Sequence, residues 1–227
     1  MNQHSSTFKV AFPVTIPVLF GYIAIGIPFG LMLVNAGYPW WLAPIMSTLI
    51  FAGAAQYIAV GLFAAQVPLP GILLTILLVN IRHIVYGLSL IEKFKLTGRW
   101  KPYLIFSLTD ETYALLTGVK VPDGLEPGPF FGIIALLNQS YWIIGSILGA
   151  LAGELIPFSF AGIDFALTAL FMVLLIDQLR STKNFGPAAI GLVSAILALI
   201  FVGPSQMLIA ALCGALGLLI LLKGKNT

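Results

Sequence analysis

Apolar blocks of about the length of a membrane-spanning helix follow one another along almost the entire chain. A helix needs about 20 mostly apolar residues to cross the hydrocarbon core of a bilayer. Charged residues and prolines divide the 227 residues into eight such blocks, near residues 10–34, 40–66, 69–91, 103–119, 130–152, 160–179, 187–202 and 206–222. The sequence therefore predicts an all-α, polytopic integral membrane protein with about seven or eight helical segments. Because the connections are short, we expect a single transmembrane domain over residues 1–227.

The scarcity of charge excludes a soluble fold. Hydrophobic residues make up 59% of the chain and charged residues only 8%, against roughly 25% charged residues in an ordinary soluble domain. Lipid is therefore expected to be the solvent for most of the surface. The net charge of +3 comes from short basic stretches between apolar blocks, which is typical of an orientation signal and not of a nucleic-acid-binding surface.

Three basic segments predict which connections are cytoplasmic. The loop at 92–102 contains the stretch EKFKLTGRWK (92–101), with four basic residues and one acidic residue. Arg180 and Lys183 mark a second segment, and Lys223 and Lys225 mark the C-terminal tail. Loops rich in Lys and Arg face the cytoplasm, so all three segments are expected on that side.

An odd number of apolar blocks lies between the first two basic segments, so at least one of these blocks is expected not to cross the membrane completely. Three blocks separate the first two basic segments, whereas a chain that returns to the cytoplasm crosses an even number of times. The block at 103–119 is the shortest of the three and has Asp110 and Glu111 near its middle. We expect it to be broken or re-entrant. Before the first basic loop, either the N-terminus is outside despite Lys9 or the block at 40–66 is also interrupted.

Two short stretches resemble each other across the chain. FAGAAQ at 51–56 and FVGPSQ at 201–206 share the pattern F-x-G-x-x-Q. Internal repeats are common in secondary transporters, but a match this short also arises by chance in a chain rich in Phe, Gly and Ala. If the repeat is real, Gln56 and Gln206 occupy corresponding positions and are candidates for one polar cavity.

Asn80, Arg82 and His83 form the first cluster of polar residues inside an apolar block, in the stretch LLVNIRHIVYG. Ionisable residues within a membrane are functional candidates by default. Asn80 and His83 are three residues apart and so share one face of a helix. They are interpreted as part of a polar site with Arg82. The alternative is that Arg82 only anchors a helix end by extending towards the interface.

Thr109, Asp110, Glu111 and Thr112 form the second cluster, in SLTDETYALL. Two neighbouring carboxylates in a low dielectric do not both stay ionised easily, so one is expected to have a raised pKa or a cationic partner. Arg82 is a candidate for that partner. The alternative is an interfacial helix whose carboxylates lie in water.

The first block contains the stretch GYIAIGIPFGLML, in which Gly26 and Gly30 form a GxxxG pair on either side of Pro28. Small residues at this spacing permit close packing of two helices. Alternatively, the backbone opens at Pro28 and its free polar groups face a cavity that binds a ligand.

The chain lacks the signatures of the common enzyme classes. It has no Walker A loop, no HExxH, no GxGxxG after a strand and no GxSxG, so we predict no enzyme activity, no cofactor and no coupling to ATP within this chain. Cys213 is the only cysteine, which gives neither an internal disulfide nor metal-ligand spacing.

The motifs GIPFG, FAGAAQY, NIRHIVYGLSL, TDETYAL and IDFALTALF, in this order, resemble the AzlC family, the large subunit of branched-chain amino-acid exporters. The resemblance covers nearly the whole chain. It implies a multi-pass protein of the plasma membrane of a bacterium or archaeon. It also implies export of branched-chain amino acids and methionine together with a small, hydrophobic AzlD-type subunit.

Export against a gradient without a nucleotide site requires an ion gradient, most simply proton exchange through Asp110, Glu111 or His83. Two other functions remain open from the residues alone. One is a structural or regulatory membrane subunit whose polar residues only hold helices together. The other is a channel-like facilitator without coupling of its own.

Overall fold

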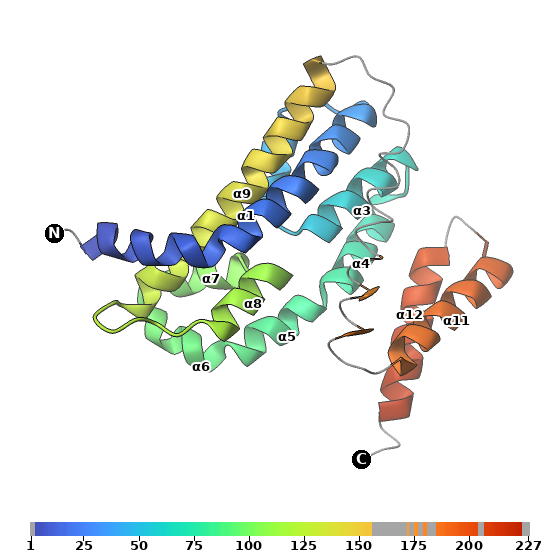
Figure 1. Cartoon of the computed structure of the whole chain (residues 1–227). Helices are drawn as coiled ribbons and strands as arrows, with labels where there is room; N and C mark the ends of the chain where they lie inside the picture. Colours follow the sequence, from blue (N-terminus) through green and yellow to red (C-terminus); the bar gives the residue numbers. More distant parts are fainter. Residues whose placement is uncertain are drawn as a thin grey trace. The chain divides into compact units, whose positions relative to one another are not determined.

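The computed structural model describes residues 3–155, 172, 175–176, 179–180, 185–203 and 207–223. In this part of the chain every regular element is a helix (Figure 1). The elements are, in order, α1 (Gln3–Asn35), α2 (Leu42–Leu49), α3 (Gly53–Ala64), α4 (Leu69–Asn80), α5 (Arg82–Ser89), α6 (Ile91–Phe94), the 3₁₀ helix η1 (Lys95–Trp100), α7 (Lys101–Phe106), α8 (Asp110–Gly118), α9 (Pro127–Leu155), α11 (Gly186–Phe201) and α12 (Met207–Lys223). The all-α prediction is confirmed.

The helices belong to two compact units. The first comprises Met1–Ala65 and Val79–Asp164, and the second comprises Gln66–Leu78 and Phe165–Thr227. The first unit contains all of the predicted site residues except Gln206, so the site is built within it. In the second unit α11 and α12 pack against each other.

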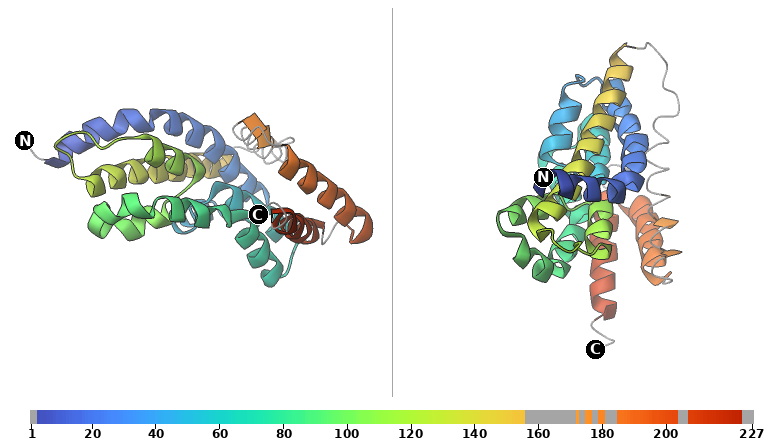
Figure 2. Two further views of the ribbon diagram at one scale, coloured as in Figure 1. Left: turned by 90° about the horizontal axis from the view of Figure 1, so that it is seen from below. Right: turned by 60° about the vertical axis from the view of Figure 1, so that its left-hand side comes forward.

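Helices α1 and α9 are the two longest helices and lie side by side (Figures 1 and 2). Their contact is made through glycines: a Cβ atom added at Gly30 would collide with the backbone of Ser146 and Ala150, and one added at Gly149 would collide with the backbone of Ile27. The GxxxG pair therefore serves helix packing, as the first of the two interpretations predicts.

Helix α1 continues through Pro13, Pro17 and Pro28 without interruption. The backbone does not open at Pro28, so the alternative interpretation of this stretch is wrong. A proline removes one helical hydrogen bond, and neighbouring side chains in a membrane protein can satisfy the groups that it affects. In the turn before Pro28, the hydroxyl of Tyr57 donates to the carbonyl oxygen of Ile25 at 2.6 Å.

Three of the predicted apolar blocks are interrupted. The block at 103–119 breaks between α7 and α8, as predicted from parity. The block at 40–66 breaks between α2 and α3, which was one of the two alternatives left open for it. The block at 69–91 breaks at residue 81, between α4 and α5, which the sequence analysis did not anticipate. Within the described residues, two helices are long and apolar enough to cross a membrane, or three if α4 and α5 form one span. The expected seven or eight segments are not confirmed as spans.

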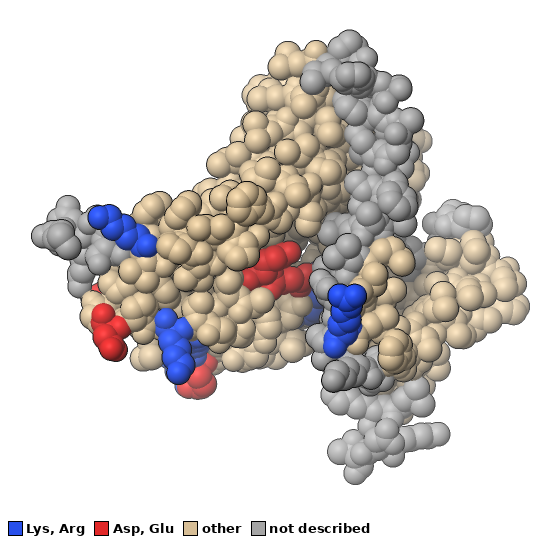
Figure 3. Space-filling model, viewed as in Figure 1, with Lys and Arg blue, Asp and Glu red and all other residues tan. Residues whose placement is uncertain are grey.

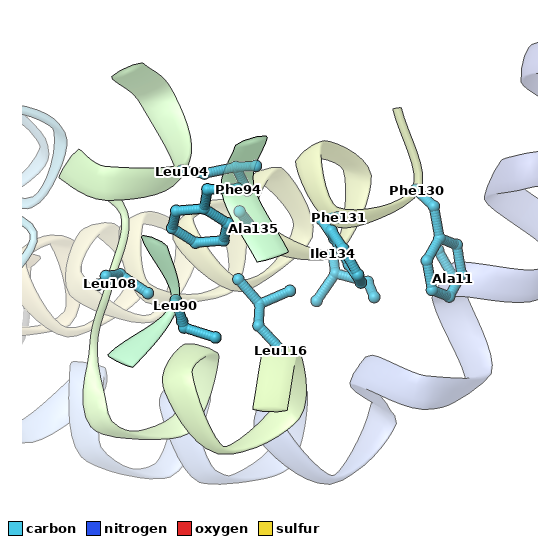
Figure 4. Close-up of a cluster of buried hydrophobic side chains, with 10 residues drawn as sticks. All are labelled: Ala11, Leu90, Phe94, Leu104, Leu108, Leu116, Phe130, Phe131, Ile134 and Ala135. Carbon is cyan, nitrogen blue, oxygen red and sulfur yellow. The ribbon is translucent and has the colours of Figure 1, made fainter. Parts of the chain in front are cut away.

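A cluster of buried apolar side chains holds α8 and the short helices α5 to α7 against α9 (Figure 4). Its members are Ala11, Leu90, Phe94, Leu104, Leu108, Leu116, Phe130, Phe131, Ile134 and Ala135. Leu104 lies in α7 and Leu108 lies in the break between α7 and α8, and both are buried. The broken block is thus fixed in place by its apolar side chains.

Uncharged side chains cover most of the face shown in Figure 3, and charged residues appear on it in a few separate places. Many large apolar side chains are exposed, among them Phe20, Leu77, Phe201 and Leu221. Such a surface is stable in lipid and not in water.

Candidate functional site

A pocket of about 240 Å³ lies where three broken blocks meet. It is lined by residues next to the breaks between α2 and α3, between α4 and α5, and between α7 and α8, namely Ile50, Phe51, Ala52, Asn80, His83, Ile105, Phe106 and Leu108. Irregular backbone at membrane depth is tolerated where it is buried or lines a cavity. The pocket is therefore the natural candidate for a ligand site in this unit.

The backbone around Phe51 is unusual and leaves the N-terminus of α3 next to the pocket. Phe51 has φ of 41°, a value that bulky residues rarely adopt. Helix α3 begins at Gly53 and has no side-chain cap from Ala52. The first N–H groups of a helix have no partner inside the helix and attract negative charge, so this end of α3 offers donors for an anionic group.

Asn80 and His83 both line the pocket, although they lie on different helices, Asn80 at the end of α4 and His83 in α5. The Nδ1 atom of His83 lies 3.0 Å from the carbonyl oxygen of Asn80, which fixes the ring against the end of α4. The ring of His83 also contacts that of Tyr86, with centroids 5.5 Å apart.

Arg82 and Asp110 form an ion pair beside the pocket. The Nη2 atom of Arg82 lies 2.9 Å from Oδ2 of Asp110, and the hydroxyl of Tyr86 donates to Oδ1 of Asp110 at 2.7 Å. Both carboxylate oxygens of Asp110 are thus engaged, one by a cation. Arg82 is the cationic partner that the sequence analysis suggested for the two carboxylates.

Glu111 has different neighbours from Asp110. The hydroxyl of Tyr22 in α1 donates to Oε2 of Glu111 at 2.8 Å and also shares a short hydrogen bond with the hydroxyl of Thr109. Thr109 is the N-cap of α8 and accepts from the backbone N–H of Thr112 at 3.2 Å. Among the described residues, Glu111 forms no ion pair.

Lys93 complements these acidic residues at the other end of α8. Its ammonium group donates to the carbonyl oxygens of Leu116 and Val119 and lies 5.0 Å from the ring centroid of Phe131. Burial lowers the pKa of Lys93. With carboxylates at the N-terminus and a lysine at the C-terminus, α8 has charge that opposes its dipole at both ends.

Gln56 lies outside the pocket, in the interface of α2, α3 and α9. It is fully buried; its Nε2 donates to the hydroxyl of Ser47 at 3.1 Å, and its Oε1 accepts from Nε1 of Trp142 at 2.8 Å. The Ser47 hydroxyl donates in turn to that of Ser146 at 2.8 Å. Gln206 falls outside the described residues, so its correspondence with Gln56 stays a prediction.

Tyr22, Phe51 and Asn138 belong to the site but were not identified from the sequence. Asn138 is fully buried in α9, and its Nδ2 donates to the hydroxyl of Thr112 at 3.0 Å. Two adjacent amides, Asn138 and Gln139, within a long apolar helix are a recognisable signal. Nothing in the local sequence indicates that Tyr22 reaches Glu111 or that Phe51 adopts a positive φ.

Comparison with known proteins gives a consistent result. The family described as AzlC protein matches residues 17–156. A Bacillus subtilis protein named branched-chain amino acid transport protein AzlC is 37% identical over 98% of this chain and 89% of its own length. An uncharacterized membrane protein of Helicobacter pylori is 42% identical over 93% of both chains. The inner membrane protein YgaZ of Escherichia coli is 30% identical over 95% of this chain and 91% of its own length.

No solved structure matches the chain. The relatives are named as membrane or inner membrane proteins, and the apolar helices α1 and α9 are long enough to span a bilayer. The protein is therefore a cell-membrane protein with a role in membrane transport, and the chain belongs to the AzlC family.

Proposed function

We propose that this chain is the permease subunit of a secondary transporter that exports branched-chain amino acids, and also methionine, in exchange for protons. The observation that carries the proposal is the pocket at three helix breaks. In secondary transporters, discontinuous helices supply the ends that bind the substrate and the coupling ion. The substrate class is supported by the name of the Bacillus subtilis relative.

The pocket has separate features for the parts of an aliphatic amino acid. Ile50, Ile105, Phe106 and Leu108 provide apolar walls for the side chain. The uncapped N-terminus of α3 at Gly53 suits the carboxylate. Sites for drug-sized ligands have volumes of roughly 300–1,000 Å³, so a pocket of about 240 Å³ favours a smaller solute.

The ammonium group of the substrate needs acceptors or negative charge. The C-terminal end of α4 lies at Asn80 and carries the negative end of a helix dipole. Asn80 and His83 line the same pocket and are proposed to orient the substrate there.

Glu111 is the best candidate for the proton carrier. Asp110 is paired with a cation, because Nη2 of Arg82 lies 2.9 Å from its Oδ2. Among the described residues, the hydrogen-bond donors to Glu111 are neutral: the Tyr22 hydroxyl at 2.8 Å, the Thr109 hydroxyl and a backbone N–H. A carboxylate without a cation in a low dielectric gains and loses a proton more readily. His83 is the next candidate.

The direction of transport and the small AzlD-type partner are proposed from the family. The partner is expected to share the membrane with this chain, and the exposed apolar side chains are expected to face either the partner or lipid. No nucleic acid or cofactor is involved in this proposal.

Transport of labelled leucine in proteoliposomes tests the proposal. The chain is reconstituted with and without an AzlD-type protein, and with and without a pH gradient. Accumulation that requires the pH gradient supports a proton-coupled transporter. Equilibration of leucine at the same rate with and without the pH gradient indicates a channel-like facilitator. The absence of leucine flux both with and without the partner indicates a structural or regulatory subunit.

A further inference from the structure

Phe51 belongs to the wall of the pocket and also to the surroundings of Glu111. It lines the pocket, and its ring meets the ring of Tyr22 edge to face, with centroids 6.4 Å apart and an angle of 88° between the planes. The hydroxyl of Tyr22 donates in turn to Oε2 of Glu111 at 2.8 Å. Two side-chain contacts therefore connect the proposed substrate pocket with the proposed proton carrier.

The side chains that make this connection are closely packed. Phe51 is 2% exposed and Tyr22 is 4% exposed. The ring of Tyr22 also meets the indole of Trp142 edge to face, with centroids 5.6 Å apart, and a hydrogen bond of 2.8 Å from Nε1 of Trp142 to Gln56 holds that indole in place. Because protein interiors are packed without free space, a displacement of Phe51 is expected to move the ring of Tyr22.

The backbone at Phe51 is held in an unfavourable conformation. Its φ of 41° lies in the left-handed region, which bulky residues rarely adopt. The residue lies in the break between α2 and α3, outside both helices. Such conformations persist only where the surrounding contacts hold them, and they gather at ligand sites and switching segments. A substrate side chain in the pocket would contact this ring directly and so act on its conformation.

We propose that Phe51 is a positioning residue that couples the substrate in the pocket to the proton on Glu111 through the ring of Tyr22. A leucine side chain packed against Phe51 keeps the hydroxyl of Tyr22 on the carboxylate, and donors of this kind favour the ionised form of a carboxylate. Protonation of Glu111 weakens the same hydrogen bond, releases Tyr22 and Phe51, and lowers the affinity for leucine.

This inference rests on the proposed function and deepens it. Exchange of an amino acid for a proton requires that each disfavours the binding of the other. The coupling is reciprocal: if leucine favours release of the proton, the proton weakens the binding of leucine by the same factor. Phe51 and Tyr22 supply the physical contact between the two sites.

Several titratable or charged groups surround Glu111. Tyr22 faces it from α1, and Asp110 is its neighbour in α8. From α5, Arg82 and Tyr86 both bond to Asp110. Helix α9 presents a neutral amide to α8. A substitution of Phe51 leaves all of these groups in place, so a change in coupling is assigned to the missing ring.

Binding of labelled leucine to the purified protein in lipid, with and without an AzlD-type protein, tests the inference without any transport step. In the parent protein the dissociation constant should rise at least about fivefold as the pH falls and Glu111 gains its proton, since allosteric coupling is typically 5- to 150-fold. Glu111→Gln should remove this pH dependence. Phe51→Leu keeps an apolar side chain but has no ring to contact Tyr22, and should reduce the change to below about twofold.

Phe106→Leu is the matched control. It makes the same chemical change in the wall of the same pocket, but the ring of Phe106 is 44% exposed and its centroid lies 6.4 Å from that of Tyr103. This variant should keep the pH dependence of the parent protein. A purely structural role of Phe51 would change the affinity by the same factor at every pH. If Phe51→Leu does not fold, Tyr22→Phe removes the hydroxyl bound to Glu111, keeps the ring and should reduce the pH dependence in the same way.

The outcomes separate this inference from the proposed function. A pH dependence in Phe51→Leu or Tyr22→Phe as large as that in Phe106→Leu overturns the coupling through Phe51 and leaves the proposed function standing. A leucine affinity that does not depend on pH in the parent protein, or a dependence that survives Glu111→Gln, also overturns the inference; the second result assigns the proton to another group. Absence of leucine binding to the parent protein, both with and without the partner, overturns the proposed function itself.

Discussion

The Nη2 atom of Arg82 lies 2.9 Å from Oδ2 of Asp110 and joins α5 to the first turn of α8. The pair lies beside the pocket, and both side chains are partly exposed. The two adjacent carboxylates at the start of α8 therefore have different surroundings, because within the described part of the chain only Asp110 has a cationic partner. This asymmetry underlies the assignment of the proton to Glu111.

Arg82→Gln should strongly reduce transport while Arg82→Lys retains part of it, because lysine keeps the charge but not the planar fork of donors. The double variant Arg82→Gln/Asp110→Asn removes both charges and should be no worse than Arg82→Gln alone. Leucine flux and the yield of folded protein are measured for all three. Independent, additive losses in the double variant would show that the two residues do not act as a pair.

Gly30→Ala should greatly lower the yield of folded protein, because the added Cβ meets the backbone of Ser146 and Ala150. Overpacking of this kind typically costs about 1–3 kcal/mol or more. Gly21→Ala is the matched control in the same helix, since a Cβ there has no neighbour within 4 Å. Size-exclusion profiles and thermal unfolding in detergent compare the two, and equal stability would contradict the close contact of α1 with α9.

Gln56→Leu should lower the thermal stability of the protein more than its affinity for substrate. The change leaves Nε1 of Trp142 and the hydroxyl of Ser47 without their partner in a fully buried place, at roughly 1–3 kcal/mol for each unsatisfied group. Thermal unfolding and leucine affinity are measured together. If the variant is as stable as the parent protein but binds leucine more weakly, Gln56 acts in substrate binding and not in helix packing.

The sequence predicts the helical membrane fold and one of the three breaks because the charged and polar residues that indicate them are local features. The carboxylates at 110 and 111 indicate that the block at 103–119 is interrupted, whereas parity leaves open whether the block at 40–66 is interrupted or the N-terminus is outside. The break at residue 81 carries no Gly or Pro signal. The pattern of apolar residues runs through it and gives no other signal.

The site was predicted in the same uneven way. The helical spacing of Asn80 and His83 does not apply, because the helix breaks between them, but both line one pocket. The expected cationic partner, Arg82, is present at Asp110. From the sequence alone, Gln56 cannot be distinguished from a residue that lines a cavity. In the structure its side chain instead bonds Ser47 of α2 and Trp142 of α9. Tyr22 contacts Glu111 across 89 residues of sequence, a distance at which local pattern gives no information.

The basic loop at 92–102 should be labelled from the cytoplasmic side only, as its lysines and arginine require. A single cysteine at Leu96 is suitable, because this side chain is 72% exposed whereas Thr97 is buried. The background is Cys213→Ala, since Cys213 is also exposed. Labelling with a membrane-impermeant maleimide in intact cells and in inverted vesicles gives the side directly. Reaction in intact cells would reverse the predicted orientation.

Glu111→Gln should abolish accumulation driven by a pH gradient while exchange of labelled for unlabelled leucine at equal concentrations stays measurable. Net export needs a proton to be bound on one side and released on the other, but exchange does not. Gln is close to the shape of a protonated Glu, and its amide can still contact the hydroxyl of Tyr22, so the variant should fold.

Asp110→Asn is the informative comparison, because it lies next to Glu111 but acts through Arg82. It should lower both exchange and accumulation, since the arginine beside the pocket loses its partner. The two carboxylates are thus expected to have different roles. Glu111→Gln should abolish accumulation and leave exchange, whereas Asp110→Asn should lower both. If both variants keep accumulation driven by pH, the carboxylates are structural, and His83, which lines the pocket, becomes the residue that must carry the proton.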